Sequence, residues 1–488
     1  MAGLAITLVS GVLLALYLDW NFVELGLVLG LAAARSRLHA PWFDRIEQFG
    51  VQVARRRGVC IVAAFVLPIL IRVALLPWDP VPQPWLPDEF SHLLVADTLV
   101  HRRLANPSHP LWVNFETIHE IFKPTYASIY FPGLGLVLAV GTLLGHAWIG
   151  VLLSSGAMCA ALLWMLYGFF PPRWALLGGM LAVLRWGALS YWVNSYWGGT
   201  IGALAGALVF GAYARLRKRP SISHSTVLGL GLVLLAYTRP LEGFMVGASV
   251  MAALLWSWRT RPSAELVRAA VPAFVLIGLG LAVLGMYFQA ITGSPFHMPY
   301  RVNQELYGWP LTLPWDHPKL VSYRNPDLAA YYEWERCTQL RKTWPVEALK
   351  FSTFTLGPLW RFFVGPALTV PLLLGGRWYR SPKIRLLVIC LVISCVVGFV
   401  IAAYPHYVAP AAGCCLAAVV QGLRYLRLRS VAWTRAVLAT CCLMVPLRAF
   451  VDSRHLPHTL PGYHSWSALG HDQGQHRAGL VKRLLQTP

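Results

Sequence analysis

Apolar runs of about 20 residues recur along almost the whole chain, and they constrain the fold more than any other feature. Residues 58–77 and 148–170 are two examples. A helix needs about 20 apolar residues to cross the hydrocarbon core of a bilayer. Lipid offers no hydrogen bonds to a backbone, so such runs cross the membrane as helices. Because 57% of the 488 residues are hydrophobic and 12% are charged, we predict an all-α polytopic membrane protein.

The basic residues lie mainly in short segments between these runs. The segments are 35–37, 55–57, 215–220, 259–262, 377–385 and 424–430. A net charge of +21 could suggest nucleic acid, but no polar segment combines a basic groove with interleaved aromatic residues. We therefore expect no nucleic-acid partner. Short basic loops instead mark the cytoplasmic side of a membrane protein and favour anionic membrane lipids.

Placing every basic loop on one side gives a topology of eleven crossings. They are predicted at 58–77, 148–170, 174–191, 195–214, 225–238, 243–257, 269–291, 351–374, 384–402, 406–423 and 431–447. Residues 4–34 and 131–147 are also apolar but do not fit the alternation as simple crossings, so we expect 11 to 13 helices in all.

This topology divides the chain into three parts. Residues 1–57 form an apolar segment and a basic cytoplasmic linker, residues 58–447 form the transmembrane domain, and residues 448–488 form an external tail. Two large polar loops, at about 78–130 and 293–348, are predicted on the external side.

An acidic pair stands out in the first external loop. Asp88 and Glu89 are adjacent in "WLPDEF", although the chain has only 20 acidic residues. Pro87 favours a helix start here, and on a helix two neighbours point about 100° apart. We therefore expect unequal roles for the two carboxylates. Their place near the interface favours an enzyme over a transporter, which would bury ionisable groups near the bilayer midplane.

Four stretches resemble the GT-C glycosyltransferases, most of all the branch of protein O-mannosyltransferases and lipid A aminoarabinose transferases. They are the first external loop with its "DE" pair, "SYWVNSYWGG" (190–199), "TRPLEG" (238–243) and "YPHYVAPA" (404–411). The resemblance covers about residues 58–425. It implies a GT-C-like helical bundle that transfers a sugar, with inversion, from a polyprenyl-phosphate donor to an acceptor hydroxyl at the outer face. It also implies that Asp88, the first acid of the pair, is the catalytic base.

The residue types in these stretches suit that reaction. An acceptor hydroxyl needs a base within hydrogen-bond reach, and a leaving phosphate needs cations and hydrogen-bond donors. The family pattern has a lysine directly before its proline element, whereas this chain has Ile-Tyr-Phe before Pro132. The candidates for binding the donor phosphate or substrate are Lys123, Tyr126, Tyr130, Arg239, Arg301, His406 and Tyr407. Glu89 is a further candidate, with helix capping and support of the loop as its alternative role.

Metal binding is not predicted. Glu116, His119 and Glu120 lie close together in "FETIHE", but no specific metal motif such as HExxH is present. A hydrogen-bonded cluster is the favoured interpretation, and no cofactor is expected.

Two other functions stay open at this point. The protein could be a transporter or lipid flippase, or a non-catalytic membrane scaffold. For the favoured function we expect an integral membrane protein of the bacterial inner membrane, with its site facing the periplasm or exterior. Its expected partners are the lipid-linked sugar, membrane lipids and a glycan, lipid or protein acceptor.

Overall fold

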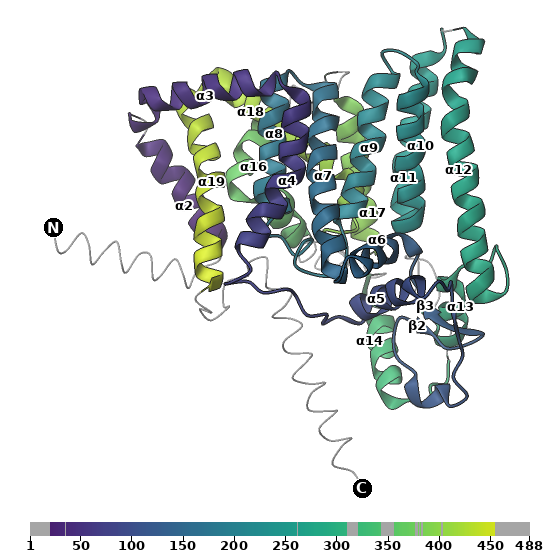
Figure 1. Cartoon of the computed structure of the whole chain (residues 1–488). Coiled ribbons are helices and arrows are strands. Elements are labelled where there is room, and N and C mark those ends of the chain that lie inside the picture. Colours follow the sequence, from purple (N-terminus) through teal and green to yellow (C-terminus); the bar gives the residue numbers. More distant parts are fainter. Residues whose placement is uncertain are drawn as a thin grey trace, which may run out of the picture.

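The computed structural model describes residues 20–34, 36–260, 262–309, 321–342, 356–375, 379, 381, 384–401 and 404–453. These residues form a bundle of roughly parallel helices with a small mixed assembly at one end (Figure 1). The predicted all-α class is confirmed, apart from three very short strands in the first external loop.

In the described part of the chain, six helices are long and apolar enough to cross a membrane, or seven if a bent pair of helices counts as one span. The six are α4 (Arg57–Ala74), α7 (Ala147–Phe169), α11 (Pro240–Trp258), α12 (Ser263–Thr292), α18 (Ala412–Arg429, continuing η5, Ala409–Ala411) and α19 (Val431–Ser453). The bent pair is Leu356–Phe363 with α16 (Gly365–Leu374), which meet at 88°. The chain is thus an integral membrane protein.

Five shorter apolar helices stand beside these spans. They are α2 (Trp20–Ala33), α6 (Pro132–Leu143), α9 (Thr200–Leu216), α10 (Ile222–Thr238) and α17 (Arg385–Ile401). The predicted count of 11 to 13 crossings depends on how many of them also cross, so the count stays a prediction. Residues 131–147, which resisted assignment as a crossing, contain the 12-residue helix α6 at the end of the bundle (Figure 1).

One predicted crossing is interrupted. In place of a continuous helix over 174–191, α8 (Pro172–Ala182) continues into one turn of π-helix, η3 (Val183–Gly187), and residues 188–199 follow without regular helix. The segment ends at Gly198 and Gly199, both with positive φ. The prediction of a continuous helix was therefore wrong. The apolar sequence indicates burial in the membrane but does not reveal the change of backbone conformation.

The core of the bundle is built on close approach between backbones. On α9, a Cβ added at Gly206 would lie 1.9 Å from the carbonyl oxygen of Pro410, so only glycine fits there. Small residues at helix interfaces allow this approach in membrane proteins. Val209 and Phe210, on the next turn of α9, are fully buried. This packing fixes the residues just before α18 against α9, where part of the candidate site lies.

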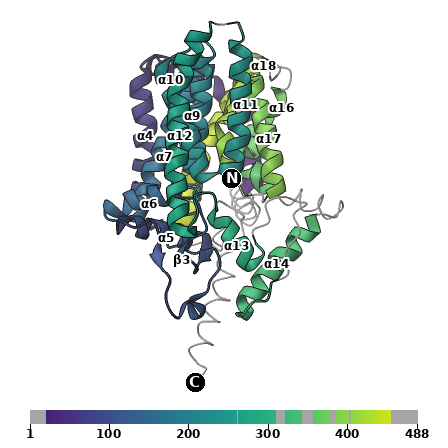
Figure 2. The same ribbon diagram turned by 90° about the vertical axis from the view of Figure 1, so that its right-hand side faces the viewer.

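The small assembly at one end contains most of the first external loop. It comprises α5 (Pro87–Val100), β1 (Asn106–Pro107), η2 (Trp112–Phe115), β2 (Glu120–Ile121), β3 (Thr125–Ser128), α13 (Pro299–Tyr307) and α14 (Pro326–Lys342). The strands are antiparallel in the order β1-β3-β2, with Glu120 opposite Ser128. Figure 2 shows α13 and α14 beside this sheet, at the same end of the bundle. The two predicted external loops therefore meet in space.

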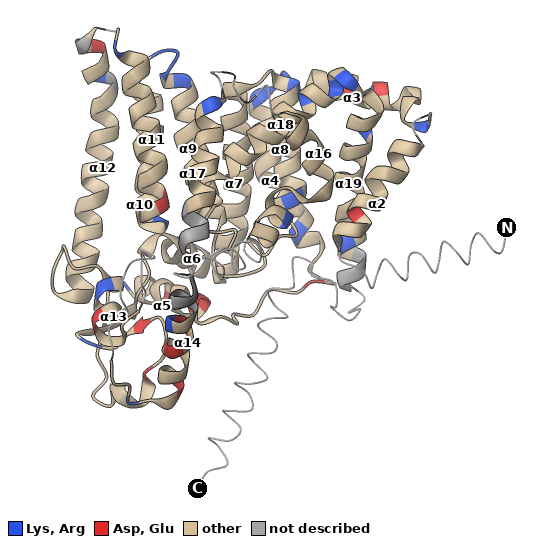
Figure 3. Cartoon of the chain, turned by 180° about the vertical axis from the view of Figure 1, so that it is seen from behind, with Lys and Arg blue, Asp and Glu red and all other residues tan. Residues whose placement is uncertain are grey.

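Basic side chains gather at the opposite end. Figure 3 shows Lys and Arg along the edge that carries α3 (Pro41–Ala54). Acidic side chains lie at the other end, around α5, α13 and α14. Glu47 on α3 pairs with Arg427, 2.6 Å away, and with Arg435, 2.8 Å away. Arg37, in the basic segment 35–37, begins η1 (Arg37–His39), whereas most of the basic segment 377–385 lies outside the described residues. The predicted clustering of basic loops on one side agrees with this arrangement.

Candidate active site

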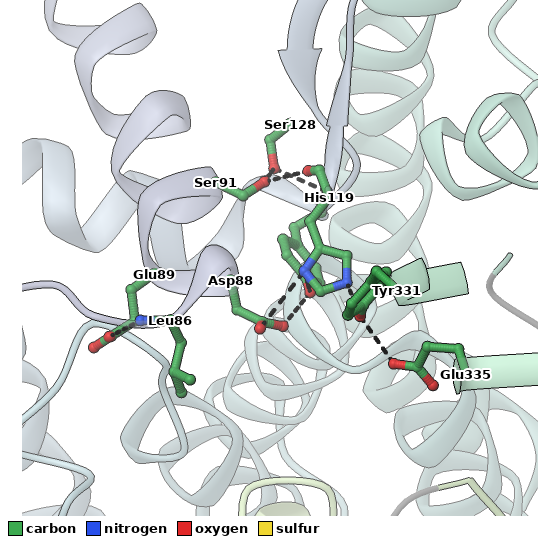
Figure 4. Close-up of polar contacts among 9 residues, drawn as sticks. Leu86, Asp88, Glu89, Ser91, His119, Ser128, Tyr331 and Glu335 are labelled. Carbon is green, nitrogen blue, oxygen red and sulfur yellow. Dashed lines mark hydrogen bonds and ion pairs between the residues drawn. The ribbon is translucent and has the colours of Figure 1, made fainter. Parts of the chain in front are cut away.

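The helix that carries the acidic pair begins where the sequence predicts. Helix α5 starts at Pro87, whose fixed φ suits a first helical position, and Asp88 and Glu89 fall in its first turn. The two carboxylates point in different directions from this turn (Figure 4). Their separation follows from the helical geometry and confirms that they do not face one centre.

Asp88 faces a group of side chains that can donate protons. Its Oδ1 accepts a hydrogen bond from the Tyr130 hydroxyl, and its Oδ2 lies 3.6 Å from Nδ1 of His119. Burial on its own raises the pKa of Asp88, but the charge and hydrogen bond of His119, together with Tyr130, outweigh burial and hold the pKa well below its usual range. The pKa of His119 is raised. Burial lowers this pKa, but the charge of Asp88 and its hydrogen bond raise it by more. Asp88 is therefore ionised at neutral pH.

Glu89 is turned toward the backbone. Its Oε2 accepts from the N–H groups of Trp85 (2.8 Å) and Leu86 (2.9 Å), and its Oε1 accepts from the N–H of Tyr196 (2.8 Å). The side chain is 3% exposed. These bonds cap α5 and connect it to residues 188–199. The geometry of Glu89 therefore matches helix capping and not contact with a substrate.

A cavity lies at the end of the bundle beside Asp88. Its lining comes from six separate parts of the chain: Asp88, His92, Tyr130, Phe131, Leu134, Trp197, Gly198, Gly199, Ile201, Gly202, Thr238, Arg239, Tyr300, His406 and Tyr407. Arg239 sits between α10 and α11, with its guanidinium carbon 4.5 Å from the centre of the Tyr407 ring. The cavity thus combines a carboxylate, a guanidinium, two imidazoles and several hydroxyl groups.

Two histidines of this lining are held in different ways. The ring of His406 is fixed by Tyr191, whose hydroxyl lies 3.0 Å from Nδ1 of His406. His92 stacks on Tyr130 with ring centres 4.4 Å apart, and its Nδ1 has no hydrogen-bond partner among the described residues. Burial lowers the pKa of His92 to about 3, so this imidazole is neutral. A buried polar atom without a partner is uncommon, and here it belongs to a side chain that lines the cavity.

Five of the nine predicted residues come together around this cavity. Asp88, Tyr130, Arg239, His406 and Tyr407 all line it. They are contributed by the first external loop, the α10–α11 junction and the segment before α18, which are far apart in the sequence.

Lys123, Tyr126 and Arg301 do not line the cavity, and neither does Glu89. Lys123 is exposed, with its Nζ 4.9 Å from the centre of the Trp112 ring. Tyr126 stacks on Phe122 and bonds to Glu120, and Arg301 donates to Gln304 over 2.7 Å. Lys123 lies between β2 and β3, Tyr126 on β3 and Arg301 on α13, and in these places none of the three reaches the cavity.

Three residues of the site were not predicted. His92 lies four residues after Asp88, on the same helix face, so its spacing was a usable signal. His119 was weighed only as part of a metal cluster, and Tyr300 in the second loop was not singled out. Glu116 accepts instead from Tyr307 (2.7 Å). Within the described ranges no three His, Cys, Asp or Glu side chains are grouped so that they could hold a metal ion.

No protein-family model and no curated protein matches the chain. Among solved structures, the chain is similar to the Archaeoglobus fulgidus oligosaccharyltransferase in complex with zinc and sulfate, at 13% identity and a TM-score of 0.49 over 80% of this chain and 52% of that one. It is also similar to that enzyme tethered to an acceptor peptide (11%, TM-score 0.48, 80% and 55%). A third similar structure is archaeal AglB with an inhibitory peptide and a dolichol-phosphate (11%, TM-score 0.40, 84% and 53%).

The chain spans about half the length of these enzymes. A likeness at this identity and TM-score assigns neither a family nor an activity to the chain. The function has to be argued from the site.

Proposed function

We propose that the chain is a glycosyltransferase of the GT-C type, which moves a sugar from a polyprenyl-phosphate donor to an acceptor hydroxyl with inversion. The observation that carries this proposal is that Asp88 and Arg239 line one cavity at the end of a membrane bundle. The reaction needs an acceptor for the hydroxyl proton and a cation for the leaving phosphate in the same space. Within the GT-C type, we further propose that the chain is most similar to the branch of protein O-mannosyltransferases and lipid A aminoarabinose transferases.

Asp88 takes the proton of the acceptor hydroxyl. The O–H bond of the acceptor breaks and its oxygen bonds to the anomeric carbon. The bond from that carbon to the donor phosphate breaks, and its electron pair leaves with the phosphate. Because the pKa of Asp88 is low, the carboxylate is a weak base and accepts the proton only as the new bond forms. A sugar centre with oxocarbenium character suits such a late transfer.

Arg239 is the residue that we assign to the donor phosphate. A guanidinium can contact two phosphate oxygens at once, and Tyr407 lies against it. His92, His406 and Tyr300 add polar groups to the lining. Phe131, Leu134 and Ile201 give the same cavity an apolar wall, as a donor with a polyprenyl chain requires.

The cavity's place in the membrane completes the proposal. The basic edge of the molecule lies opposite α5, α13 and α14 (Figure 3), and basic loops mark the cytoplasmic side. This polarity supports a site at the outer face, and we propose a bacterial inner-membrane protein whose site faces the periplasm or exterior, with residues 58–447 as the catalytic domain. The acceptor is a glycan, lipid or protein hydroxyl.

The test is a glycan and glycolipid analysis of a strain that lacks the protein, complemented with wild type or Asp88→Asn. The amide keeps the shape of the side chain but removes the base, so we expect the missing glycan to be restored by wild type and reduced about 10²- to 10⁴-fold by the variant. Asp97→Asn is the matched control, because Asp97 is on the same helix with 62% of its side chain exposed.

Full restoration by Asp88→Asn would refute the catalytic assignment. Transport of a lipid-linked sugar in vesicles, unaffected by Asp88→Asn, would favour the transporter alternative instead.

A further inference from the structure

His119 lies between the candidate base and an external helix. Its Nδ1 is 3.6 Å from Oδ2 of Asp88 and 3.4 Å from the hydroxyl of Tyr130. Its Nε2 is 3.2 Å from the hydroxyl of Tyr331 on α14, and that hydroxyl donates to Glu335 over 2.8 Å. Figure 4 shows this continuous line of polar contacts from Asp88 to Glu335. The two ends belong to the first and the second external loop.

The backbone of His119 is held in an unusual conformation. Its φ of 66° is in the left-handed region, which only a few per cent of non-glycine residues adopt, with asparagine, aspartate and histidine the most frequent among them. Its carbonyl oxygen accepts from the Ser91 hydroxyl at 2.6 Å and from the N–H of Ile129 at 3.3 Å. Ser128 supports Ser91 from 2.7 Å. A conformation of this kind persists only where the surroundings fix it, and it is common at functional sites.

These contacts fix His119 relative to Asp88. Ser91 is one helical turn after Asp88 on α5, so the same helix carries the carboxylate and anchors the imidazole. His119 itself does not line the cavity. It therefore acts on the reaction through Asp88 and not by touching a substrate.

We propose that His119 is a positioning residue that orients Asp88 toward the cavity and makes this orientation depend on the docking of α14. This inference rests on the proposed function. A doubly protonated imidazole donates one N–H toward Asp88 and the other toward Tyr331, whereas a neutral imidazole has a single N–H and serves one of them only. Loss of the proton, or undocking of α14, thus loosens Asp88.

The charges around His119 favour the protonated form. The groups that face it are Asp88 and His92 from α5, Glu120 from β2 and Glu335 from α14. Burial lowers the pKa of His119, and the three carboxylates raise it above its usual value. These carboxylates therefore favour the protonated imidazole more than water would, and the proton is lost as the pH rises through this raised pKa. Activity should fall on the alkaline side for this reason.

The experiment uses the full-length protein in lipid nanodiscs with a polyprenyl-phosphate sugar and measures kcat, KM and the pH profile. His119→Asn is the main variant, since asparagine tolerates a left-handed backbone. We expect kcat to fall about 10- to 100-fold, as for a misplaced catalytic group. The KM for the donor should change less than about twofold, and the alkaline limb that depends on His119 should disappear. His101→Asn is the control, at an exposed histidine on the C-terminal end of α5, the helix that carries Asp88.

Tyr331→Phe provides a second, milder variant that keeps the ring packing of α14. It removes the hydroxyl that links His119 to Glu335, so the alkaline limb should move to lower pH. A wild-type kcat and pH profile in both variants would overturn the inference, and so would a loss of thermal stability without any change in kcat. Such a result together with an inactive Asp88→Asn leaves the proposed function standing, whereas an active Asp88→Asn removes both.

Discussion

Two carboxylates, the buried Glu24 and the partly buried Asp88, each lie beside basic side chains, yet their surroundings differ in kind. Glu24 on α2 is 2% exposed and lies 3.4 Å from Arg185 and 3.7 Å from Arg448. The Asp88 carboxylate meets His119 and the hydroxyl of Tyr130 and borders a cavity with Arg239.

The partners beyond the first contact separate the two regions. Arg185 donates to the carbonyl oxygens of Arg361 (3.0 Å) and Phe362 (3.2 Å), at the end of the helix 356–363. Glu24 accepts from the N–H of Ala367 (3.2 Å), at the start of α16. Arg185 and Glu24 thus bond backbone groups on both sides of the 88° bend, where the regular helical pattern is interrupted. Asp88 is bonded instead to side chains that can exchange protons. Buried charge bonded to backbone supports architecture, and buried charge bonded to side chains at a cavity supports chemistry.

The largest effect on stability is expected from Glu24→Leu. Removing one partner of a buried ion pair leaves the other charge uncompensated and costs about 3–5 kcal/mol. The variant should be extracted in lower amount and unfold at a lower temperature, measured on the detergent-solubilised protein. Leu25→Ala is the control, because Leu25 is the next residue and is 40% exposed. Equal stability of the two variants would mean that the bend does not depend on Glu24.

Glu89→Gln sharpens the comparison within a single helical turn. Glu89 is adjacent to Asp88 in sequence, but its three backbone donors group it with Glu24. The amide retains one acceptor oxygen and turns an NH₂ toward the remaining N–H, so we expect a loss of about 1–3 kcal/mol in stability. The activity per folded molecule should stay near wild type, measured as kcat on protein that elutes as a single species. A variant that is as stable as wild type but inactive would move Glu89 into the catalytic group.

Arg239→Lys tests the other side of the cavity. The charge beside Glu242 is kept, whereas the planar guanidinium that can contact two phosphate oxygens is lost. The value of kcat/KM for the lipid-linked donor should fall by about tenfold or more, with little change in melting temperature. Arg301→Lys is the matched control, since Arg301 is exposed and bonded to Gln304. Equal kinetics for the two variants would argue against phosphate binding at Arg239.

Sequence reasoning predicted the spans best where apolar runs are long and end at basic loops. The predicted crossings 58–77 and 148–170 correspond to α4 (Arg57–Ala74) and α7 (Ala147–Phe169). It failed where the backbone changes conformation inside an apolar run, as in 188–199, because hydropathy does not report φ and ψ. For the site, the chemistry of Asp88 and Arg239 was visible in their residue types. The role of His119 was not, since it depends on a left-handed residue and on contacts with α14 in the other loop.

The smallest effect is expected from Lys123→Gln, and it tests whether the loop keeps this conformation during catalysis. The lysine before Pro124 was a candidate phosphate ligand, but its ammonium lies over the Trp112 ring and outside the cavity lining. An exposed contact of this kind contributes about 0.5–1 kcal/mol, so stability should change by no more than that and kcat/KM by less than about twofold. Initial rates at several donor concentrations measure this. A loss of tenfold or more would show that Lys123 reaches the donor once the substrate binds. The first external loop would then have to rearrange during catalysis, and the division between charges that support architecture and charges that support chemistry would change when substrate binds.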